Sequence, residues 1–178
     1  MNTQGIRLGV DIGRVIIGGG VVSGSSDTQF FGSDTARMLA TPAVPGAFDA
    51  LSRLVPRFEG VWLVSKCGER VQRRSRQWLD HHDFWARTGM SRHNVRFCLA
   101  RPDKAVHCAE LGITHFVDDR LDVHRALRGV VAHRYLFGPQ PAPPPDWVRH
   151  TATWPAAEAA IVRSLRTAVT LGRAPGSP

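Results

Sequence analysis

The sequence predicts an α/β protein built on a doubly wound parallel sheet. Short apolar runs rich in β-branched residues alternate along the chain with longer segments whose apolar residues have helical spacing. Strands that alternate with helices in this way form parallel sheets with right-handed crossovers. Carboxylate or hydroxyl residues follow several of the apolar runs. In a parallel sheet these strand ends share the edge at which ligands bind.

The expected strands are apolar runs bounded by glycine, proline or charged residues. They cover residues 6–12, 15–22, 61–65, 94–100, 114–119 and 131–137. Glycines lie within and after the second of these runs. We therefore expect this part of the chain to form a β-hairpin flap beside the first strand.

The expected helices have apolar residues at intervals of three and four. They lie within residues 41–60, 69–85, 102–112, 120–127 and 154–172. Proline near a helix start and glycine at its end mark several boundaries, as Gly112 does for the third helix.

The length of 178 residues predicts one globular domain. Residues 1–138 would form its core, and a proline-rich linker would follow at 139–146. Residues 147–172 would form a C-terminal helix that docks on the core, and 173–178 a disordered tail.

The composition is that of an ordinary soluble chain, with 43% hydrophobic and 21% charged residues. Arg7, Asp11 and Arg14 interrupt the first apolar run, which is not typical of a signal peptide. No run reaches the roughly 18 to 20 apolar residues of a membrane span. We therefore expect a cytoplasmic protein that does not associate with a membrane. Its three cysteines form no Cys-x-x-Cys pair and predict neither a disulfide framework nor a zinc site.

The net charge of +8 is compatible with a polyanionic partner. However, the basic residues are almost all arginine, with lysine at positions 66 and 104 alone, which indicates a compositional bias. The bias weakens the argument from charge and makes each lysine more informative. Seven arginines follow in the stretch from 70 to 96, and they are Arg70, Arg73, Arg74, Arg76, Arg87, Arg92 and Arg96.

Four groups of polar residues stand at predicted strand ends or helix starts: Asp11, Ser65, Lys104 and the pair Asp118 and Asp119. Because the strand ends share one edge of a parallel sheet, these residues can converge on one pocket. A carboxylate can attack phosphorus, and a serine can donate to a phosphoryl oxygen. A lysine can neutralise charge there, and carboxylates can hold Mg²⁺. The sequence therefore predicts a site that handles phosphate.

In these residues the chain resembles the haloacid dehalogenase superfamily. The four motifs of that superfamily are a nucleophilic Asp, a Ser or Thr, a Lys or Arg, and an acidic pair. Here they stand in that order as "VDIGRVI", "LVSK", "RPDKA" and "FVDDRLD", within residues 8–122. The resemblance implies a Rossmann-like core and phosphohydrolase activity.

The resemblance also implies residue roles. Asp11 would form an aspartyl-phosphate, and Lys104 would bridge the nucleophile and the phosphoryl group. Mg²⁺ would be held by Asp11, the backbone carbonyl of Gly13 and Asp119, and Asp118 would assist. The substrate phosphoryl group would be bound by Ser65, Lys66 and Arg14.

The chain departs from the pattern at Gly13, where phosphatases of the superfamily usually carry a second Asp as general acid and base. General acid–base catalysis is worth roughly 10²- to 10⁴-fold in rate. A subgroup with Asp-x-Gly-Asn-Val at this place is also assigned to phosphatases, and here Arg14 replaces the Asn. A sugar-kinase-like ATPase also opens with Asp-x-Gly after a strand, but Arg14 and Val15 continue the motif differently and the chain is short for two domains around a nucleotide.

The spacing between the motifs leaves no room for a large cap, the inserted module that closes such sites. An open site suits a bulky substrate, or closure by a homo-oligomer. The leading hypothesis is a Mg²⁺-dependent phosphohydrolase acting on a phosphomonoester, either a phosphorylated small molecule or a nucleic-acid end. The alternative is a catalytically weak or inactive domain of the same fold that binds a phosphorylated ligand, nucleic acid or protein partner.

Overall fold

The computed structural model describes residues 5–18 and 34–171, with side chains up to Arg166. Its centre is a six-stranded sheet in which all neighbouring strands are parallel, in the order β3-β2-β1-β4-β5-β6. The strands are β1 (Arg7–Val10), β2 (Gly60–Lys66), β3 (Val95–Cys98), β4 (His115–Asp118), β5 (His133–Phe137) and β6 (Arg149–Thr151). This confirms the predicted α/β class with a parallel sheet.

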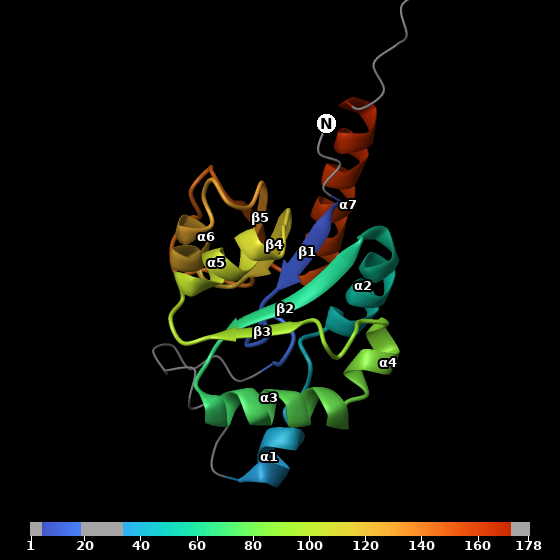
Figure 1. Cartoon of the computed structure of the whole chain (residues 1–178), viewed down its shortest axis with the longest axis vertical. Coiled ribbons are helices and arrows are strands. Elements are labelled where there is room, and N and C mark those ends of the chain that lie inside the picture. Colours follow the sequence, from blue (N-terminus) through green and yellow to red (C-terminus); the bar gives the residue numbers. More distant parts are fainter. Residues whose placement is uncertain (1–4, 19–33, 172–178) are drawn as a thin grey trace, which may run out of the picture.

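Helices cover both faces of the sheet (Figure 1). The α-helices are α1 (Thr35–Leu39), α2 (Ala47–Leu54), α3 (Glu69–His81), α4 (Phe84–Thr88), α5 (Asp103–Glu110), α6 (Leu121–Ala126) and α7 (Trp154–Leu171), and a short 3₁₀ helix spans Val55–Arg57. The larger core contains buried residues of α2, α3, α4 and α7, and the smaller core contains residues of α5 and α6. Successive residues of β2 divide between the two cores, Leu63 in the larger and Val64 in the smaller, as a doubly wound sheet requires.

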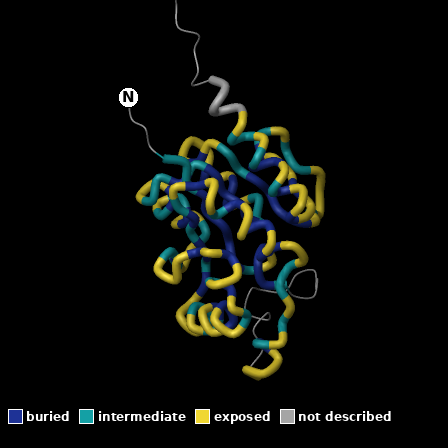
Figure 2. The backbone as a smooth tube through the Cα atoms, turned by 90° about the vertical axis from the view of Figure 1, so that its right-hand side faces the viewer, coloured by how far each residue is buried: buried dark blue, intermediate teal, exposed yellow. Residues whose placement is uncertain are grey.

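Burial follows this layered arrangement. In Figure 2 the buried positions run through the centre of the molecule, and the exposed positions lie on the outer turns. Gly9 in β1 is part of the packing, because a Cβ at this position would lie 2.4 Å from Cδ2 of Phe116 on β4. Among the described residues, no helix is both long and apolar enough to cross a membrane.

The β-hairpin predicted for 15–22 is wrong for residues 15–18, which form a turn, while 19–22 lie outside the described residues. The backbone amides of Ile16 and Ile17 both donate to the carbonyl of Ile12. Arg14 adopts the left-handed conformation, with φ of 60°. The apolar residues of the turn are buried in the larger core, so their apolar character reflects burial and not a strand.

The helix predicted for 69–85 is interrupted after His81. Asp83 has a left-handed φ of 53°, and α4 starts at the next residue. The break turns Phe84 into the core, where it is fully buried and its ring centroid lies 5.1 Å from that of Phe48. The break in the helix predicted for 69–85 therefore coincides with the burial of the Phe84 ring in the core.

The segment 147–153, expected to be helical, contains the strand β6, which extends the sheet beyond the strand at 131–137. The strand reads "RHT" and has no apolar pattern, which is why periodicity did not reveal it. Helix α7 begins at Trp154, whose buried indole Nε1 donates to the carbonyl of Val15 at 2.7 Å. The predicted tail at 173–178 lies outside the described residues.

Candidate metal centre

Three carboxylates converge at the carboxyl edge of the sheet. Asp11 follows β1, Asp118 ends β4, and Asp119 comes next in the chain. Each offers one oxygen, and these oxygens lie within 4.8 Å of one another. The strands β1 and β4 are neighbours at the point where the strand order reverses, and open α/β sheets bind their ligands at such a point. The structure thus places the acidic group at the edge of the sheet where this type of fold generally binds ligands.

Lys104 links two of these carboxylates. It belongs to α5, is buried, and its Nζ lies 2.8 Å from Asp11 Oδ1 and 2.6 Å from Asp118 Oδ2. Burial by itself would lower the pKa of Lys104, but the two carboxylates outweigh it and raise that pKa above its ordinary value. The ammonium group therefore remains charged in the core.

The two carboxyl groups after β4 are held by different partners. Asp118 is fully buried, and its Oδ1 accepts a hydrogen bond from the backbone N–H of Arg120 at 2.9 Å. Burial raises the pKa of Asp118 and the carboxylates of Asp11 and Asp119 raise it further, against the lowering effect of Lys104. Asp119 Oδ2 lies 2.9 Å from Nε of Arg14.

The electrostatics of this cluster favour a cation. Burial and the nearby Asp11 carboxylate raise the pKa of Asp119 to about 6, although Arg14 lowers it. The raised pKa means that the ionised form of Asp119 is disfavoured, first by burial and then by the like charge of Asp11, and a bound cation would offset both effects. Carboxylate oxygens are the ligands that hard divalent cations such as Mg²⁺ prefer. The donor set of Asp11, Asp118 and Asp119 therefore fits Mg²⁺.

The position of Gly13 is open. A Cβ built on this residue would meet no atom of the described residues within 4 Å, so a side chain could begin here without a clash. Gly13 forms a β-bridge with Ile17 in the turn that follows β1. The carbonyl of Gly13 as a metal ligand stays a prediction.

Ser65 and Lys66 lie at the end of β2, the strand beside β1, and so share the edge of the cluster. Ser65 is buried and Lys66 is half-buried. Among the described residues, the ion pairs of the cluster join Lys104 with Asp11 and Asp118, and Arg14 with Asp119, and do not reach Lys66. The binding roles of both residues stay predictions.

Two residues that the sequence did not single out hold the chain after β4 in place. His124 Nε2 donates to the carbonyl of Asp118 at 3.0 Å, and burial lowers the pKa of His124 to about 4, so the ring is neutral. Gln140 Nε2 donates to the carbonyl of Asp119 at 3.1 Å. Gln140 comes from the proline-rich segment, far along the sequence, and no local pattern indicated this contact.

Several arginines of the 70–96 stretch have structural contacts. Arg87 lies over the ring of Phe48 at 4.4 Å, and Arg92 forms an ion pair with Asp80 at 2.6 Å. The other guanidinium groups that cover aromatic rings are Arg76, over Phe97, and Arg96, over Trp62. Aromatic rings or an ion pair thus engage these four arginines, and Arg73 also lies 4.0 Å from Glu69. Polyanion binding stays a prediction.

Comparison with known proteins places this fold in a class. The solved structure of D,D-heptose 1,7-bisphosphate phosphatase from B. bronchiseptica, complexed with magnesium and phosphate, matches with a TM-score of 0.65 and 14% identity over 89% of this chain and 99% of that chain. The corresponding phosphatase from Burkholderia thailandensis matches with a TM-score of 0.60 and 14% identity, over 88% and 98%. The chain therefore shares the fold of these phosphatases, which agrees with the fold that the four motifs predicted.

A third structure agrees with this assignment. A haloacid dehalogenase-like hydrolase from Burkholderia xenovorans LB400 matches with a TM-score of 0.60 and 13% identity, over 90% of this chain and 98% of that chain. No protein-family model matches the sequence, and no curated protein matches it significantly. At these identities the likeness concerns the fold.

Proposed function

We propose that this protein is a Mg²⁺-dependent phosphohydrolase that cleaves a phosphomonoester through an aspartyl-phosphate on Asp11. One observation carries the proposal: a buried lysine holds Asp11 and Asp118 together at the point where the strand order reverses. Lys104 places its positive charge 2.8 Å from Oδ1 of the carboxylate that would act as nucleophile. The structural neighbours, two of which are phosphatases, support the same class of reaction.

In the first step a carboxylate oxygen of Asp11 attacks phosphorus, and the bond between phosphorus and the ester oxygen breaks. The ester oxygen leaves with the bonding electron pair and takes a proton from water, which gives the alcohol. In the second step water attacks the phosphorus of the acyl phosphate, which releases inorganic phosphate and regenerates the Asp11 carboxylate. Lys104 offsets the charge of the phosphoryl oxygens in both steps, and Ser65 and Lys66 bind those oxygens.

Asp11, Asp118 and Asp119 would hold Mg²⁺ together with the carbonyl of Gly13. A bound Mg²⁺ supplies charge that stabilises the phosphoryl oxygens in the transition state. Arg14 forms an ion pair with Asp119 in this structure. With Mg²⁺ bound to Asp119, the guanidinium group of Arg14 would instead be able to contact the substrate phosphoryl group.

The experiment that tests this proposal is phosphate release with Mg²⁺ from a panel of phosphorylated small molecules and 3′- or 5′-phosphorylated oligonucleotides. Replacing the nucleophile, Asp11→Asn, should lower the rate by about 10⁴-fold or more. The matched control Asp49→Asn removes an exposed carboxylate of α2 and should leave the rate unchanged. Equal rates for native protein and Asp11→Asn would refute the mechanism.

Position 13 offers a second, gain-of-function test. Because a Cβ at this position would meet no described atom within 4 Å, Gly13→Asp should be accommodated and would add the missing general acid. We expect a rate increase of roughly 10²-fold or more for alkyl esters, whose alcohols are poor leaving groups. A smaller increase is expected for aryl esters, which need less protonation.

A catalytically quiet domain that binds a phosphorylated ligand is the second candidate. It is favoured by the open space at Gly13 and by the contact of Arg14 with Asp119. Binding of a phosphomonoester by native protein with Mg²⁺, without phosphate release from any panel member, would select this candidate.

A further inference from the structure

An apolar groove lies beside the acidic cluster at the carboxyl edge of the sheet. Its volume is about 450 Å³, and it is lined by the segment before α2, the loop after β5 and the loop after β6. The apolar side chains that form its walls are Val44, Pro45, Phe137, Pro139, Ala152 and Pro155. Pockets of this size hold small organic molecules.

Arg14 connects the groove to the metal centre. Its side chain lines the groove, and its Nε lies 2.9 Å from Asp119 Oδ2. The Asp119 oxygen in turn lies within 4.8 Å of an oxygen of Asp11. Gln140, in the loop after β5, also donates to the carbonyl of Asp119. A phosphoryl group at Asp11 would therefore place its ester group next to this groove.

The walls of the groove are firmly held. Trp154, between two of the lining residues, is fully buried, and its Nε1 donates to the carbonyl of Val15. Gly46 has a φ of 78°, which favours glycine, and a Cβ added there would be in ordinary contact with Cβ of Trp154 at 3.5 Å. The groove is thus part of the packed structure around α2 and α7.

The chemistry of the lining selects against sugars. Among the described residues that line the groove, only Arg14 and Thr153 carry polar side chains. A polyhydroxylated group would leave most of its hydroxyls without hydrogen-bond partners in such a groove, whereas an apolar group loses only its contact with water. A site that lacks hydrogen-bond partners discriminates against polar groups through this cost.

We propose that this groove binds the organic part of the substrate and that the substrate is a phosphomonoester of an apolar alcohol. This inference rests on the proposed function, since it assumes that the phosphoryl group lies at Asp11. The apolar group would lie between the loops after β5 and β6, with Arg14 at the junction of its phosphate and its hydrocarbon.

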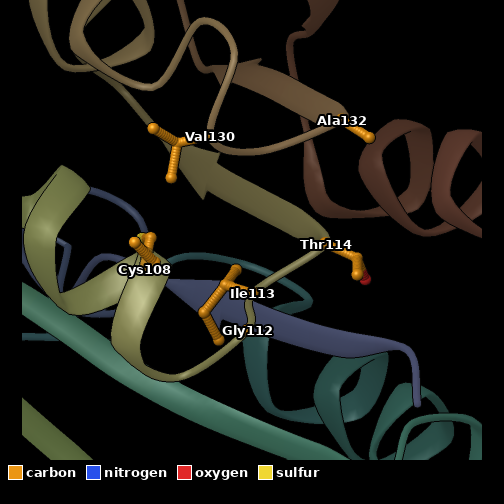
Figure 3. Close-up of a pocket in the computed structure, with 7 residues that line it drawn as sticks. Cys108, Gly112, Ile113, Thr114, Val130 and Ala132 are labelled. Atoms are coloured by element: carbon orange, nitrogen blue, oxygen red, sulfur yellow. The ribbon is translucent and has the colours of Figure 1, made fainter. Parts of the chain in front are cut away.

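A second hollow supplies a control. Figure 3 shows it at the amino end of β4, with Ile113 and Thr114 at the strand start, Cys108 from α5, and Val130 and Ala132 before β5. It is smaller, about 170 Å³, and lies at the sheet edge opposite to the carboxylates. Ala132 here and Ala152 in the groove are both exposed alanines, so the same substitution can be made at both.

The test compares two primary alkyl phosphates of similar size, cyclohexylmethyl phosphate and glucose 6-phosphate. The preference is the ratio of their kcat/KM values with Mg²⁺, and we expect native protein to favour the cyclohexylmethyl ester at least tenfold. Ala152→Asp places a charge in the groove and should lower this ratio about tenfold. Ala132→Asp should leave the ratio as in the native protein. A native ratio of one or below, or an equal ratio in all three proteins, overturns the assignment.

Binding separates this inference from the proposed activity. Calorimetric titration of Asp11→Asn with the two intact esters should show the same preference, lost with Ala152→Asp in that background. If no ester is hydrolysed by native protein but the binding preference is present, the groove assignment stands and the hydrolytic mechanism fails. If hydrolysis occurs without any binding or kinetic preference, the mechanism stands and the groove assignment fails.

Discussion

The two ends of strand β4 bury polar side chains in opposite ways. At the carboxyl end, Asp118 is fully buried beside the ammonium group of Lys104, and further carboxylates are close by. At the amino end, His115 is equally buried but meets only neutral partners. Its Nδ1 lies 2.8 Å from Thr114 Oγ1, and its Nε2 lies 3.1 Å from Ser164 Oγ.

The titration behaviour reflects this difference. Burial, together with the neighbouring His133, lowers the pKa of His115 to about 3, so the ring stays neutral and its hydrogen bonds are satisfied. At the other end burial and the like charge of neighbouring carboxylates raise the pKa values of Asp118 and Asp119. A neutral hydrogen-bonded cluster stabilises the fold, whereas buried carboxylates that lie close together favour the binding of a cation. Within one strand, the buried polar residue at the amino end, His115, thus has a structural role, whereas the one at the carboxyl end, Asp118, belongs to the candidate site.

The largest expected effect is the loss of the buried cation. Lys104→Met removes the partner of Asp118 and Asp11 and should lower the free energy of unfolding by about 3 to 5 kcal/mol at pH 8 without Mg²⁺. Adding Asp118→Asn to this variant should recover part of the loss, since the uncompensated charge is removed. Denaturant unfolding measures both. A Lys104→Met variant as stable as native protein would contradict this interpretation of the carboxyl end.

The second largest effect is expected from the addition of metal, which should raise the free energy of unfolding by binding to the carboxylates at the carboxyl end of β4. A cation at one hundred times its Kd raises the free energy of unfolding by about 2.7 kcal/mol. We expect this from Mg²⁺ for native protein and for Asp122→Asn, an exposed carboxylate at the start of α6. Asp119→Asn, which removes a member of the cluster, should shift the response to much higher Mg²⁺ concentrations. Thermal unfolding measured at increasing Mg²⁺ concentrations tests this expectation. An equal rise in stability for Asp119→Asn and native protein would contradict the hypothesis that the cluster binds the cation.

Acidification tests the amino end. The pKa of His115 is about 3 in the folded protein against 6.5 when unfolded, so between these values the unfolded chain binds a proton that the folded chain does not. Stability should therefore fall as the pH is lowered, by about 1.4 kcal/mol per pH unit from this group. His115→Gln should flatten the profile by that slope between pH 6.5 and 4. Parallel profiles for the two proteins would show that His115 is not held neutral.

The smallest effect is expected for an exposed pair near the same end. Arg7 Nε lies 3.1 Å from Glu59 Oε2, and both side chains are largely exposed, at 38% and 53%. Exposed ion pairs contribute roughly 0 to 1 kcal/mol, so Glu59→Gln should change the free energy of unfolding by less than that. A loss comparable to that of Lys104→Met would mean that burial does not control the energy of these pairs.

The sequence by itself determined the class of fold. Alternating periodicities predicted a parallel sheet, and this prediction is confirmed because periodicity is a local record of which face of an element is buried. In such a sheet Asp11, Ser65, Lys104 and the acidic pair lie at one edge, and their roles in a site stay predictions. The order and spacing of the motifs added the resemblance that the structural neighbours bear out.

Only the tertiary structure decided how distant segments complete that site. The strand β6, the turn at residues 15–18 and the end of α3 before Asp83 follow from packing between elements, and no local pattern encodes them. The same holds for the contact of Gln140 with Asp119 and for the apolar groove formed by three loops. Such contacts depend on which segments meet in space, and hydrophobic periodicity within one element carries no information about its neighbours.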